Sequence, residues 1–237
     1  MEAGPTRPPA RERRPSGALP RFDDAEPTTF VLVRHGETAL TVSKAYSGSS
    51  VPGPPLSAHG RVQAAKAADV VYRIGRDFWP DVPRPRTVIA SPMVRTQETG
   101  AAIGRRLGVR VATAPAFAEA DFGEWEGLPG AEIAERWPDL VRRWHLEGDV
   151  QAPRGESLVD IGARVGAELE GLLADGVDRT VAIASHTIAI RSAVGVTLGL
   201  PPSRWASFRV PPASVTVLRW WADGGREATV VGMPTDV

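Results

Sequence analysis

The 237-residue chain contains no cysteine. Disulfide bonds, a thiolate nucleophile and cysteine-ligated metals are therefore excluded, and the redox compartment stays undetermined. The chain also lacks a net charge, because 28 Lys and Arg residues balance 28 Asp and Glu residues. This balance gives no general attraction to nucleic acid or to an anionic membrane, and it favours a small-molecule partner.

Long apolar segments are missing as well. No apolar run reaches the roughly 18 residues that a membrane-spanning helix needs, and the N-terminal residues lack the apolar stretch of a secretory signal. We therefore expect a cytoplasmic protein without a membrane partner. The carboxylate and histidine residues show no spacing typical of a metal cage, so we expect neither a metal nor another cofactor.

Residues 1–27 are rich in proline and arginine and show no periodic apolar pattern. Such a segment cannot bury enough apolar surface to fold, so we predict a disordered tail. A basic tail could contact phosphate polymers, but a solvated extension without a specific role is the simpler interpretation.

From Thr28 onward, short apolar runs alternate with helical patterns, which predicts one α/β domain over residues 28–237. We expect a mostly parallel sheet with helices on both faces. The predicted strands cover 28–33, 87–90, 109–113, 180–184, 214–220 and, more weakly, 228–231. The predicted helices cover 58–74, 94–107, 157–173 and 188–198.

The pattern also predicts one helix face and one insertion. In the helix over 58–74, Val62, Ala65, Val70 and Ile74 approximate one apolar face. In residues 121–153 the alternation of strands and helices stops. We predict a cap insertion there, with helices near 130–137 and 139–146. Such an insertion commonly covers a site.

The chemistry-bearing residues follow the predicted strands. His35 and His186 each come directly after an apolar strand, and the strand over 87–90 leads into a helix that carries Arg95 in its first turn. Ligands of open α/β sheets bind at the carboxyl ends of the strands. Two histidines and two arginines, Arg34 and Arg95, at this edge favour a receptor for a compact anion such as a phosphoryl group.

Six segments carry a family resemblance: VLVRHGET at 31–38, LSAHGRVQA at 56–64, SPMVRTQET at 91–99, EADFGEWEG at 119–127, PRGES at 153–157 and VAIASHTIAIR at 181–191. In this order they resemble the histidine phosphatase superfamily, also called phosphoglycerate mutase-like. A lone RHGE motif would be a weak signal, whereas six ordered segments are a strong one. The resemblance implies a three-layer α/β sandwich and metal-independent hydrolysis of small phosphomonoesters.

The resemblance also implies residue roles. His35 is expected to be the nucleophile that forms a phosphohistidine, with its other ring nitrogen held by a backbone carbonyl. Arg34, Arg95 and His186 are expected to bind the phosphoryl oxygens. Glu119 aligns with the acid that protonates the departing alkoxide and later accepts a proton from water.

The sequence departs from the mutase pattern where the leaving group is held. Thr41 replaces an asparagine, Ser47 and Gly48 replace Gln-Gly, and Thr187 replaces a glycine, so we predict that these four residues contact the substrate. Residues 119–127 are similar to those of α-ribazole phosphatases. Together with residues 37–48 they also resemble the acid phosphatase module fused to ribonuclease H in bifunctional proteins. The 27 residues before Thr28 are too few for a nuclease, so only the phosphatase half is expected here.

Several residues have structural alternatives. Taken alone, His35 could be an ordinary hydrogen-bonded histidine. Only its combination with Arg34, Arg95, Glu119 and His186 favours catalysis. Glu37 and Thr38 either orient Arg34 or cap the turn after the strand. His59 and His145 match no motif position and are expected at the surface or in packing.

The aromatic residues of the cap leave similar choices. The helical spacing of Trp137, Val141 and Trp144 favours a core stripe. Phe122 and Trp125 either close the pocket or anchor the cap. Ser157 is expected to cap a helix, and Ser185 lacks the Gly-x-Ser-x-Gly surroundings of a serine nucleophile.

Other functions remain open at this stage. A phosphoglycerate mutase would use the same phosphohistidine, and a catalytically silent phosphate-binding module would keep only the anion clamp. A nuclease or DNA-binding function is weaker, because no basic stripe lies outside the tail. A homodimer is compatible with the sequence, and the natural substrate is not encoded in any motif.

Overall fold

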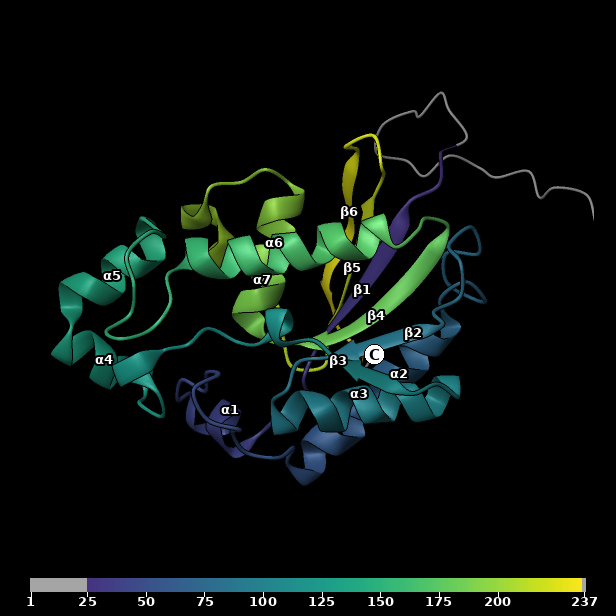
Figure 1. The fold of residues 1–237 in the computed structure, drawn as a ribbon. Coiled ribbons are helices and arrows are strands. Elements are labelled where there is room, and N and C mark those ends of the chain that lie inside the picture. The colour runs from purple at the N-terminus through teal and green to yellow at the C-terminus, as the bar shows by residue number, and fades with distance from the viewer. Residues whose placement is uncertain (1–24, 236–237) are drawn as a thin grey trace, which may run out of the picture.

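The computed structural model describes residues 25–235, and most of the predicted tail lies outside this range. Within the described residues the chain folds as a six-stranded sheet flanked by helices (Figure 1). The strands are β1 (Thr28–Arg34), β2 (Thr87–Ala90), β3 (Val111–Thr113), β4 (Arg179–Ser185), β5 (Val215–Trp220) and β6 (Arg226–Met233). The larger helices are α2 (Ala58–Arg73), α3 (Val94–Leu107), α6 (Leu158–Ala174) and α7 (Thr187–Thr197). The expected α/β class is confirmed.

The sheet has the strand order β3-β2-β4-β1-β5-β6. The first four strands in this order are parallel, and β5 pairs antiparallel with both β1 and β6. β1 and β4 lie at the centre and are almost entirely buried, as their continuous apolar runs predict. The mostly parallel sheet therefore brings the ends of β1, β2 and β4 to one edge.

The strand ends agree with the expected ones to within two residues, and β3 shows why the boundary moves. Gly108 ends α3 in the left-handed conformation, with a φ of 72°. The N–H of Val109 then donates to the carbonyl of Gly104. Because this helix cap uses the backbone of Val109, pairing with β2 begins only at Val111.

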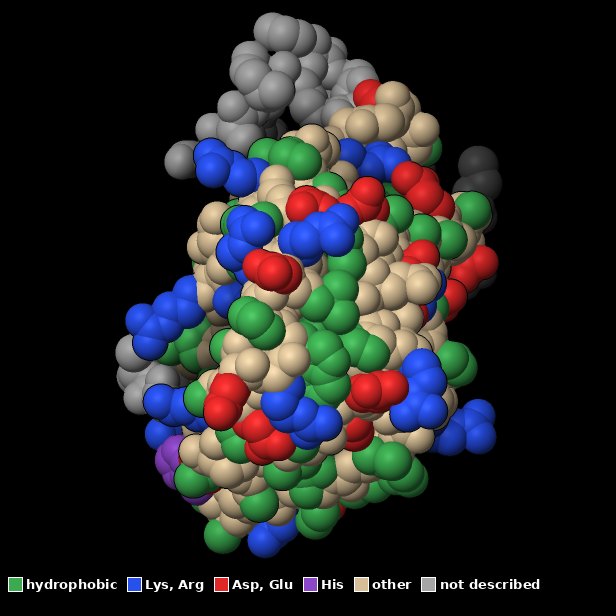
Figure 2. All heavy atoms as spheres, turned by 90° about the vertical axis from the view of Figure 1, so that its left-hand side faces the viewer, with side chains coloured by type: hydrophobic (Ala, Val, Ile, Leu, Met, Phe, Trp, Pro, Cys, Tyr) green, Lys and Arg blue, Asp and Glu red, His purple; other side chains and the backbone are tan. Residues whose placement is uncertain are grey.

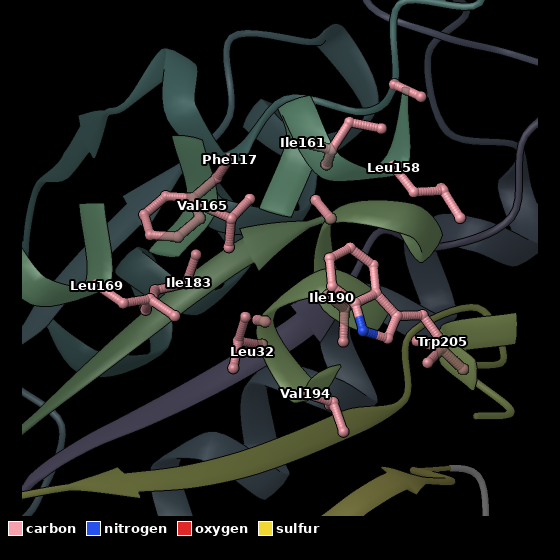
Figure 3. Packing of buried hydrophobic residues seen from close by; sticks show 14 of the residues in the cluster. Leu32, Phe117, Leu158, Ile161, Val165, Leu169, Ile183, Ile190, Val194 and Trp205 are labelled. Carbon is pink, nitrogen blue, oxygen red and sulfur yellow. The ribbon is translucent and has the colours of Figure 1, made fainter. Parts of the chain in front are cut away.

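Successive side chains of the central strands point to opposite faces of the sheet and pack into two separate cores. Phe30 and Leu32 of β1 pack with α6 and α7 on one face, whereas Val31 and Val33 pack with α2 and α3 on the other. Figure 3 shows the first core, in which Leu32 and the β4 residue Ile183 lie among side chains of α6 and α7. This three-layer arrangement fixes the sheet edge between two packed helix layers.

The predicted apolar face of the helix over 58–74 is wrong in part. Val62 is 54% exposed and Ala65 is exposed, although Ile74 is buried. The buried residues of α2 are mostly small: Gly60, Ala64, Ala67, Ala68 and Val71. α2 packs tightly against α3, and the small side chains allow this close approach.

The region predicted as a cap contains a 3₁₀ turn η2 (Gly123–Trp125) and two short helices, α4 (Gly130–Arg136) and α5 (Pro138–Leu146). Both helices end within one residue of the predicted bounds. They lie at one end of the molecule, away from α2 and α3 (Figure 1). α5 packs against η3 (Pro202–Ser207), which also contacts α7. No described helix combines the length and the apolar character needed to cross a membrane.

Candidate active site

His35 stands where β1 ends at the sheet edge. Its backbone N–H donates to the carbonyl of Ser185 over 2.9 Å, which holds the residue beside β4. The ring atom Nδ1 lies 2.7 Å from the carbonyl oxygen of Gly36. A carbonyl can only accept, so Nδ1 carries the proton and the lone pair of the neutral ring is on Nε2. A Cβ at Gly36 would collide with the backbone carbonyl of Gly60, so only glycine fits there.

Two guanidinium groups lie beside this imidazole. Arg34, the last residue of β1, donates from Nη1 to the carbonyl of Val210 over 2.8 Å. Arg95 is 0% exposed and donates from Nη2 to the carbonyls of Ser47 and Gly48, at 2.8 and 3.1 Å. Arg34 Nε, Arg95 Nε and Arg95 Nη1 are buried with no hydrogen-bond partner among the described residues. An anion that accepts these donors would remove the cost of leaving them unpaired.

His186 completes the group as the residue before α7. The parallel register pairs Arg34 with Ser185, so the two following histidines come side by side, and their ring centroids lie 5.2 Å apart. His186 Nε2 lies 2.6 Å from the hydroxyl of Ser91, at the end of β2. Its Nδ1 is buried and has no partner within the described residues. When the ring is neutral and Ser91 donates to Nε2, Nδ1 is a further donor for an anion.

Burial and positive charge set the ionisation of this group. Burial, followed by the charges of Arg95 and Arg34, holds the pKa values of both His35 and His186 well below the usual range. Burial also lowers the pKa of Arg34 to about 10, so it stays cationic at neutral pH. The edge therefore combines neutral imidazoles with charged guanidinium groups.

Glu119 lies in the loop after η1 (Pro115–Phe117) and is 6% exposed. Its Oε1 accepts hydrogen bonds from the backbone N–H groups of Ala120 and Ile188, each at 3.1 Å. Burial raises the pKa of Glu119, and the charge of Arg95 opposes this effect. A carboxyl whose pKa is raised holds its proton more readily than an ordinary glutamate, and this suits a group that gives and takes a proton.

Sequence reasoning missed the residue that holds the Glu119 loop. Arg164 of α6 donates to the backbone carbonyls of Ala116, Ala118 and Glu119 and forms a 2.8 Å ion pair with Glu156. Glu156 lies in the PRGES motif, in which only Ser157 had an expected role, as a helix cap. No sequence pattern indicated a role for Arg164, because a single arginine on an amphipathic helix is usually a solvent-exposed residue.

Two further contacts support the same side of the site. The Ser185 hydroxyl donates to the Phe117 carbonyl over 2.8 Å, which gives this serine a structural partner. Both carboxylate oxygens of Glu126 accept from the N–H of Gly48, at 3.0 and 2.8 Å. Glu126 therefore fixes the loop whose carbonyls orient Arg95. It lies inside the EADFGEWEG motif, but no role had been assigned to it.

The predicted leaving-group residues occupy different positions. Thr41 forms a capping box with Thr38 at the start of α1 (Ala39–Ser43), and its contact with substrate stays a prediction. Ser47 and Gly48 use their carbonyls to hold Arg95, while the hydroxyl of Ser47 is buried and unpaired among the described residues. Thr187 is the first residue of α7, next to His186.

The structure decides between the alternatives for Glu37 and Thr38. Thr38 caps α1, and Glu37 accepts a hydrogen bond from the hydroxyl of Ser57 over 2.7 Å. Neither residue makes a hydrogen bond to Arg34 in the part of the chain that the structure describes. The capping interpretation is correct for Thr38, whereas Glu37 binds Ser57, which is itself the cap of α2.

The aromatic residues of the cap form a core. Trp144 and Trp125 are 0% exposed, and their ring centroids lie 6.0 Å apart. Trp137 packs on Trp125, so the predicted aromatic stripe is a core stripe and Trp125 anchors the cap. His145 packs edge-on against Trp144, and His59 is exposed.

Charge on the cap end is mixed. Seen from the side of α4 and α5, Lys and Arg side chains are interspersed with Asp and Glu (Figure 2). This face carries no basic stripe of the kind that binds nucleic acid. Within residues 25–235, no three His, Cys, Asp or Glu side chains form a group that could hold a metal ion.

Known proteins resemble this chain in sequence and in fold. It is 32% identical over 205 residues to the "Bifunctional protein Rv2228c" of Mycobacterium tuberculosis, an alignment that covers 86% of this chain and 54% of that protein. The chain thus spans about half the length of this relative. It is 31% identical over 190 residues to "Phosphoserine phosphatase 1" of Hydrogenobacter thermophilus, covering 80% of this chain and 85% of the other.

A solved structure gives the same picture. The mycobacterial glucosyl-3-phosphoglycerate phosphatase Rv2419c, solved as a complex with VO3, superposes with a TM-score of 0.75 at 28% identity, covering 87% of this chain and 99% of the other. The family model described as "Histidine phosphatase superfamily (branch 1)" matches residues 30–231. Since this match spans nearly all of the described fold, the chain belongs to the histidine phosphatase superfamily.

Proposed function

We propose that this chain hydrolyses small phosphomonoesters without a metal, through a phosphohistidine on His35. One observation carries the proposal. The Nδ1 proton of His35 is engaged by Gly36, so Nε2 offers its lone pair beside two guanidinium groups with unpaired donors. The phosphatases among the relatives support the same reaction class.

In the first step, the lone pair of His35 Nε2 forms a bond to phosphorus while the bond from phosphorus to the ester oxygen breaks. Arg34, Arg95 and His186 bind the non-bridging oxygens, whose charge is dispersed in the transition state. The raised pKa of Glu119 supports its role as the acid that protonates the departing alkoxide.

In the second step, water attacks the phosphohistidine and the P–N bond breaks. The electron pair returns to Nε2 of His35, and the carboxylate of Glu119 accepts the proton of the attacking water. The bond from Nδ1 to Gly36 keeps one tautomer throughout, so the same nitrogen serves as nucleophile and leaving group.

The first test is phosphate release from p-nitrophenyl phosphate. His35→Ala should lower kcat by at least about a thousandfold, because no other group replaces the nucleophile. EDTA should leave the rate of the wild-type protein unchanged. A His35→Ala protein that keeps its activity, or a wild-type rate abolished by EDTA and restored by a divalent metal, would overturn the proposal.

The competing functions are separated by product analysis. A mutase would convert 3-phosphoglycerate to its isomer faster than it releases phosphate, whereas a phosphatase releases phosphate. A silent binding module would bind phosphate without turnover. The buried and bonded positions of His35 and Glu119 argue against the silent module, because both proposed catalytic groups are held in place.

Two other expectations stay predictions. The cytoplasmic location can be tested by fractionation of the source cells. The homodimer can be tested by light scattering of the purified chain, which distinguishes one copy from two.

A further inference from the structure

The segment LSAHGRVQA at 56–64 has no role in the proposed mechanism, although α2 begins in it next to the loop of His35. Its glutamine, Gln63, lies on α2 and is half-buried. The backbone N–H of Glu37 donates to Oε1 of Gln63 over 2.8 Å. Because Glu37 is the second residue after His35, this hydrogen bond joins α2 to the loop of the proposed nucleophile.

The N–H of Glu37 and the carbonyl of Gly36 belong to one peptide group. That carbonyl lies 2.7 Å from Nδ1 of His35. The peptide is trans, so its N–H and its C=O point in opposite directions. The Nδ1–H of His35 thus donates to one end of this peptide, and the other end donates to Gln63. We call this series, from His35 through the Gly36–Glu37 peptide to Gln63, the amide chain.

Gly60, three residues before Gln63, brings α2 close enough for this contact. A Cβ at position 60 would collide with the backbone of Glu37, so only glycine allows this approach. Residues three apart share one face of a helix, and Gln63 therefore reaches the same loop. The N–H of Gly36 is held as well, 3.3 Å from the hydroxyl of Thr99 on α3. Both peptide groups that flank Gly36 are fixed by neighbouring helices.

The attachment of α2 to this loop does not depend on Gln63. The N–H of Ser57 donates to the carbonyl of Glu37 over 2.8 Å, and the Ser57 hydroxyl donates to the Glu37 carboxylate over 2.7 Å. These two bonds involve the following peptide and the side chain of Glu37. The bond to Gln63 is the one that acts on the peptide whose carbonyl holds His35.

Hydrogen bonds in series strengthen one another, because each bond polarises the next. A peptide whose N–H donates to Gln63 carries more negative charge on its carbonyl oxygen. When Nε2 of His35 attacks phosphorus, the ring gains positive charge, which the Nδ1–H group shares. The amide chain directs the negative ends of two carbonyl groups towards this charge. The stabilisation is therefore larger in the transition state than in the resting protein.

We propose that Gln63 is a positioning residue that acts on His35 through the Gly36–Glu37 peptide. It keeps the proton of the neutral ring on Nδ1, and it stabilises the positive charge of the ring as the phosphohistidine forms. This inference rests on the proposed phosphatase function and names a residue that supports its nucleophile. Gln63 contacts the peptide and not the substrate.

The kinetic test replaces Gln63 with residues of similar length. Gln63→Met offers only a weakly accepting sulfur. Its kcat/KM for p-nitrophenyl phosphate should fall about tenfold, the scale on which an outer hydrogen-bond partner affects a functional histidine. The Ki of inorganic phosphate should stay unchanged, because the phosphate-binding side chains are intact. Gln63→Glu keeps an acceptor oxygen and should restore the rate. The matched control is Lys66→Met, an exposed residue of α2 that should keep wild-type values.

The spectroscopic test uses the resting protein without substrate. In 15N NMR spectra at neutral pH, the signals of His35 are those that disappear in His35→Ala. They should show a protonated Nδ1 and an unprotonated Nε2. The Nδ1 proton should move downfield in Gln63→Glu, because the hydrogen bond becomes stronger, and upfield in Gln63→Met. If Gln63→Met does not fold, the shift in Gln63→Glu decides alone.

The outcomes separate this inference from the general function. Wild-type kcat/KM in Gln63→Met, an equal loss in Gln63→Glu, or an Nδ1 proton signal that Gln63→Glu leaves in place overturns the role of Gln63. A phosphate Ki that rises by the factor by which kcat/KM falls does the same, since binding would then explain the loss. Wild-type turnover that depends on His35 would leave the phosphatase function standing in each case. Absence of wild-type turnover with every ester would overturn both.

Discussion

The two proposed sides of the site, one for the phosphoryl group and one for the leaving group, are built in different ways. On the phosphate side, Arg34, His35 and His186 extend from β1 and β4, so the register of a buried parallel sheet sets their positions. On the leaving-group side, Glu119 stands in a loop that is held by hydrogen bonds from Arg164 and Ser185. The phosphate side is thus fixed by the backbone of the core, whereas the leaving-group side depends on individual side chains.

This difference predicts that substitutions on the two sides lower the reaction rates of different esters in two distinct patterns. Substitutions on the phosphate side should slow all phosphomonoesters equally, because every ester presents the same phosphoryl group. Substitutions on the leaving-group side should slow alkyl esters more than p-nitrophenyl phosphate, because p-nitrophenolate departs without a proton. The ratio of the two losses measures which side a residue belongs to.

Glu119→Gln should give the largest difference between the rate loss for alkyl esters and the rate loss for p-nitrophenyl phosphate. The glutamine keeps the shape of the side chain but cannot donate a carboxylic proton. For an alkyl phosphate, kcat should fall about 10²- to 10⁴-fold, the usual contribution of a general acid. With p-nitrophenyl phosphate, the rate constant of the first chemical step, measured by rapid mixing, should fall much less. Equal losses for both esters would show that Glu119 is not the acid.

Arg95→Gln should slow both esters by the same factor. The loss should be about 10²- to 10³-fold in kcat/KM, since one donor to the transition-state oxygens is removed. Arg105→Gln on the same helix is the control, because its side chain is exposed and it should retain wild-type rates. A strong dependence of the Arg95→Gln loss on the leaving group would contradict the division into two sides.

Arg164→Gln, like Glu119→Gln, should slow alkyl esters more than p-nitrophenyl phosphate, but by a smaller factor. The variant loses the bonds to the carbonyls of Ala116, Ala118 and Glu119, so the acid is less well placed. We expect about a tenfold loss of kcat for an alkyl phosphate, a smaller loss for p-nitrophenyl phosphate, and a lower Tm. Arg164→Lys should recover part of the rate. A lower Tm without any split would assign Arg164 a purely structural role.

The pH dependence of the rate should report the shifted pKa values of His35 and Glu119. The lowered pKa of His35 keeps the imidazole neutral at pH values where a free histidine is charged, so kcat/KM should not fall as pH drops through 6.5. The raised pKa of Glu119 keeps the acid form present above its usual range, and the rate should fall as pH rises through that pKa. The optimum for alkyl esters should therefore lie below the raised pKa of Glu119, and the alkaline decline should vanish in Glu119→Gln.

The same contrast explains how much the sequence could predict. An apolar run that ends in Arg-His is visible as a strand with its functional residues at the tip, so the placement of His35 and His186 followed from local pattern and sheet geometry. Arg95 followed from its position in the first turn of a predicted helix. These residues are close in space because parallel strands end at one edge.

The leaving-group side could not be derived in this way. Glu119 lies in a loop without periodicity, and only the family resemblance indicated it. Arg164 lies 45 residues from the carbonyl of Glu119 that it binds, and no local pattern reports such a contact. The α2 face was misjudged because the contact with α3 selects small residues over the larger Val62.

The most direct measurement follows the phosphoryl group itself. The wild-type protein would be mixed with a 32P-labelled phosphomonoester, quenched within milliseconds under alkaline conditions that preserve phosphohistidine, and digested for peptide mapping. The account predicts transient label on His35, attached at Nε2, and no label in His35→Ala. Label on another residue, or phosphate release in His35→Ala at the wild-type rate, would contradict it.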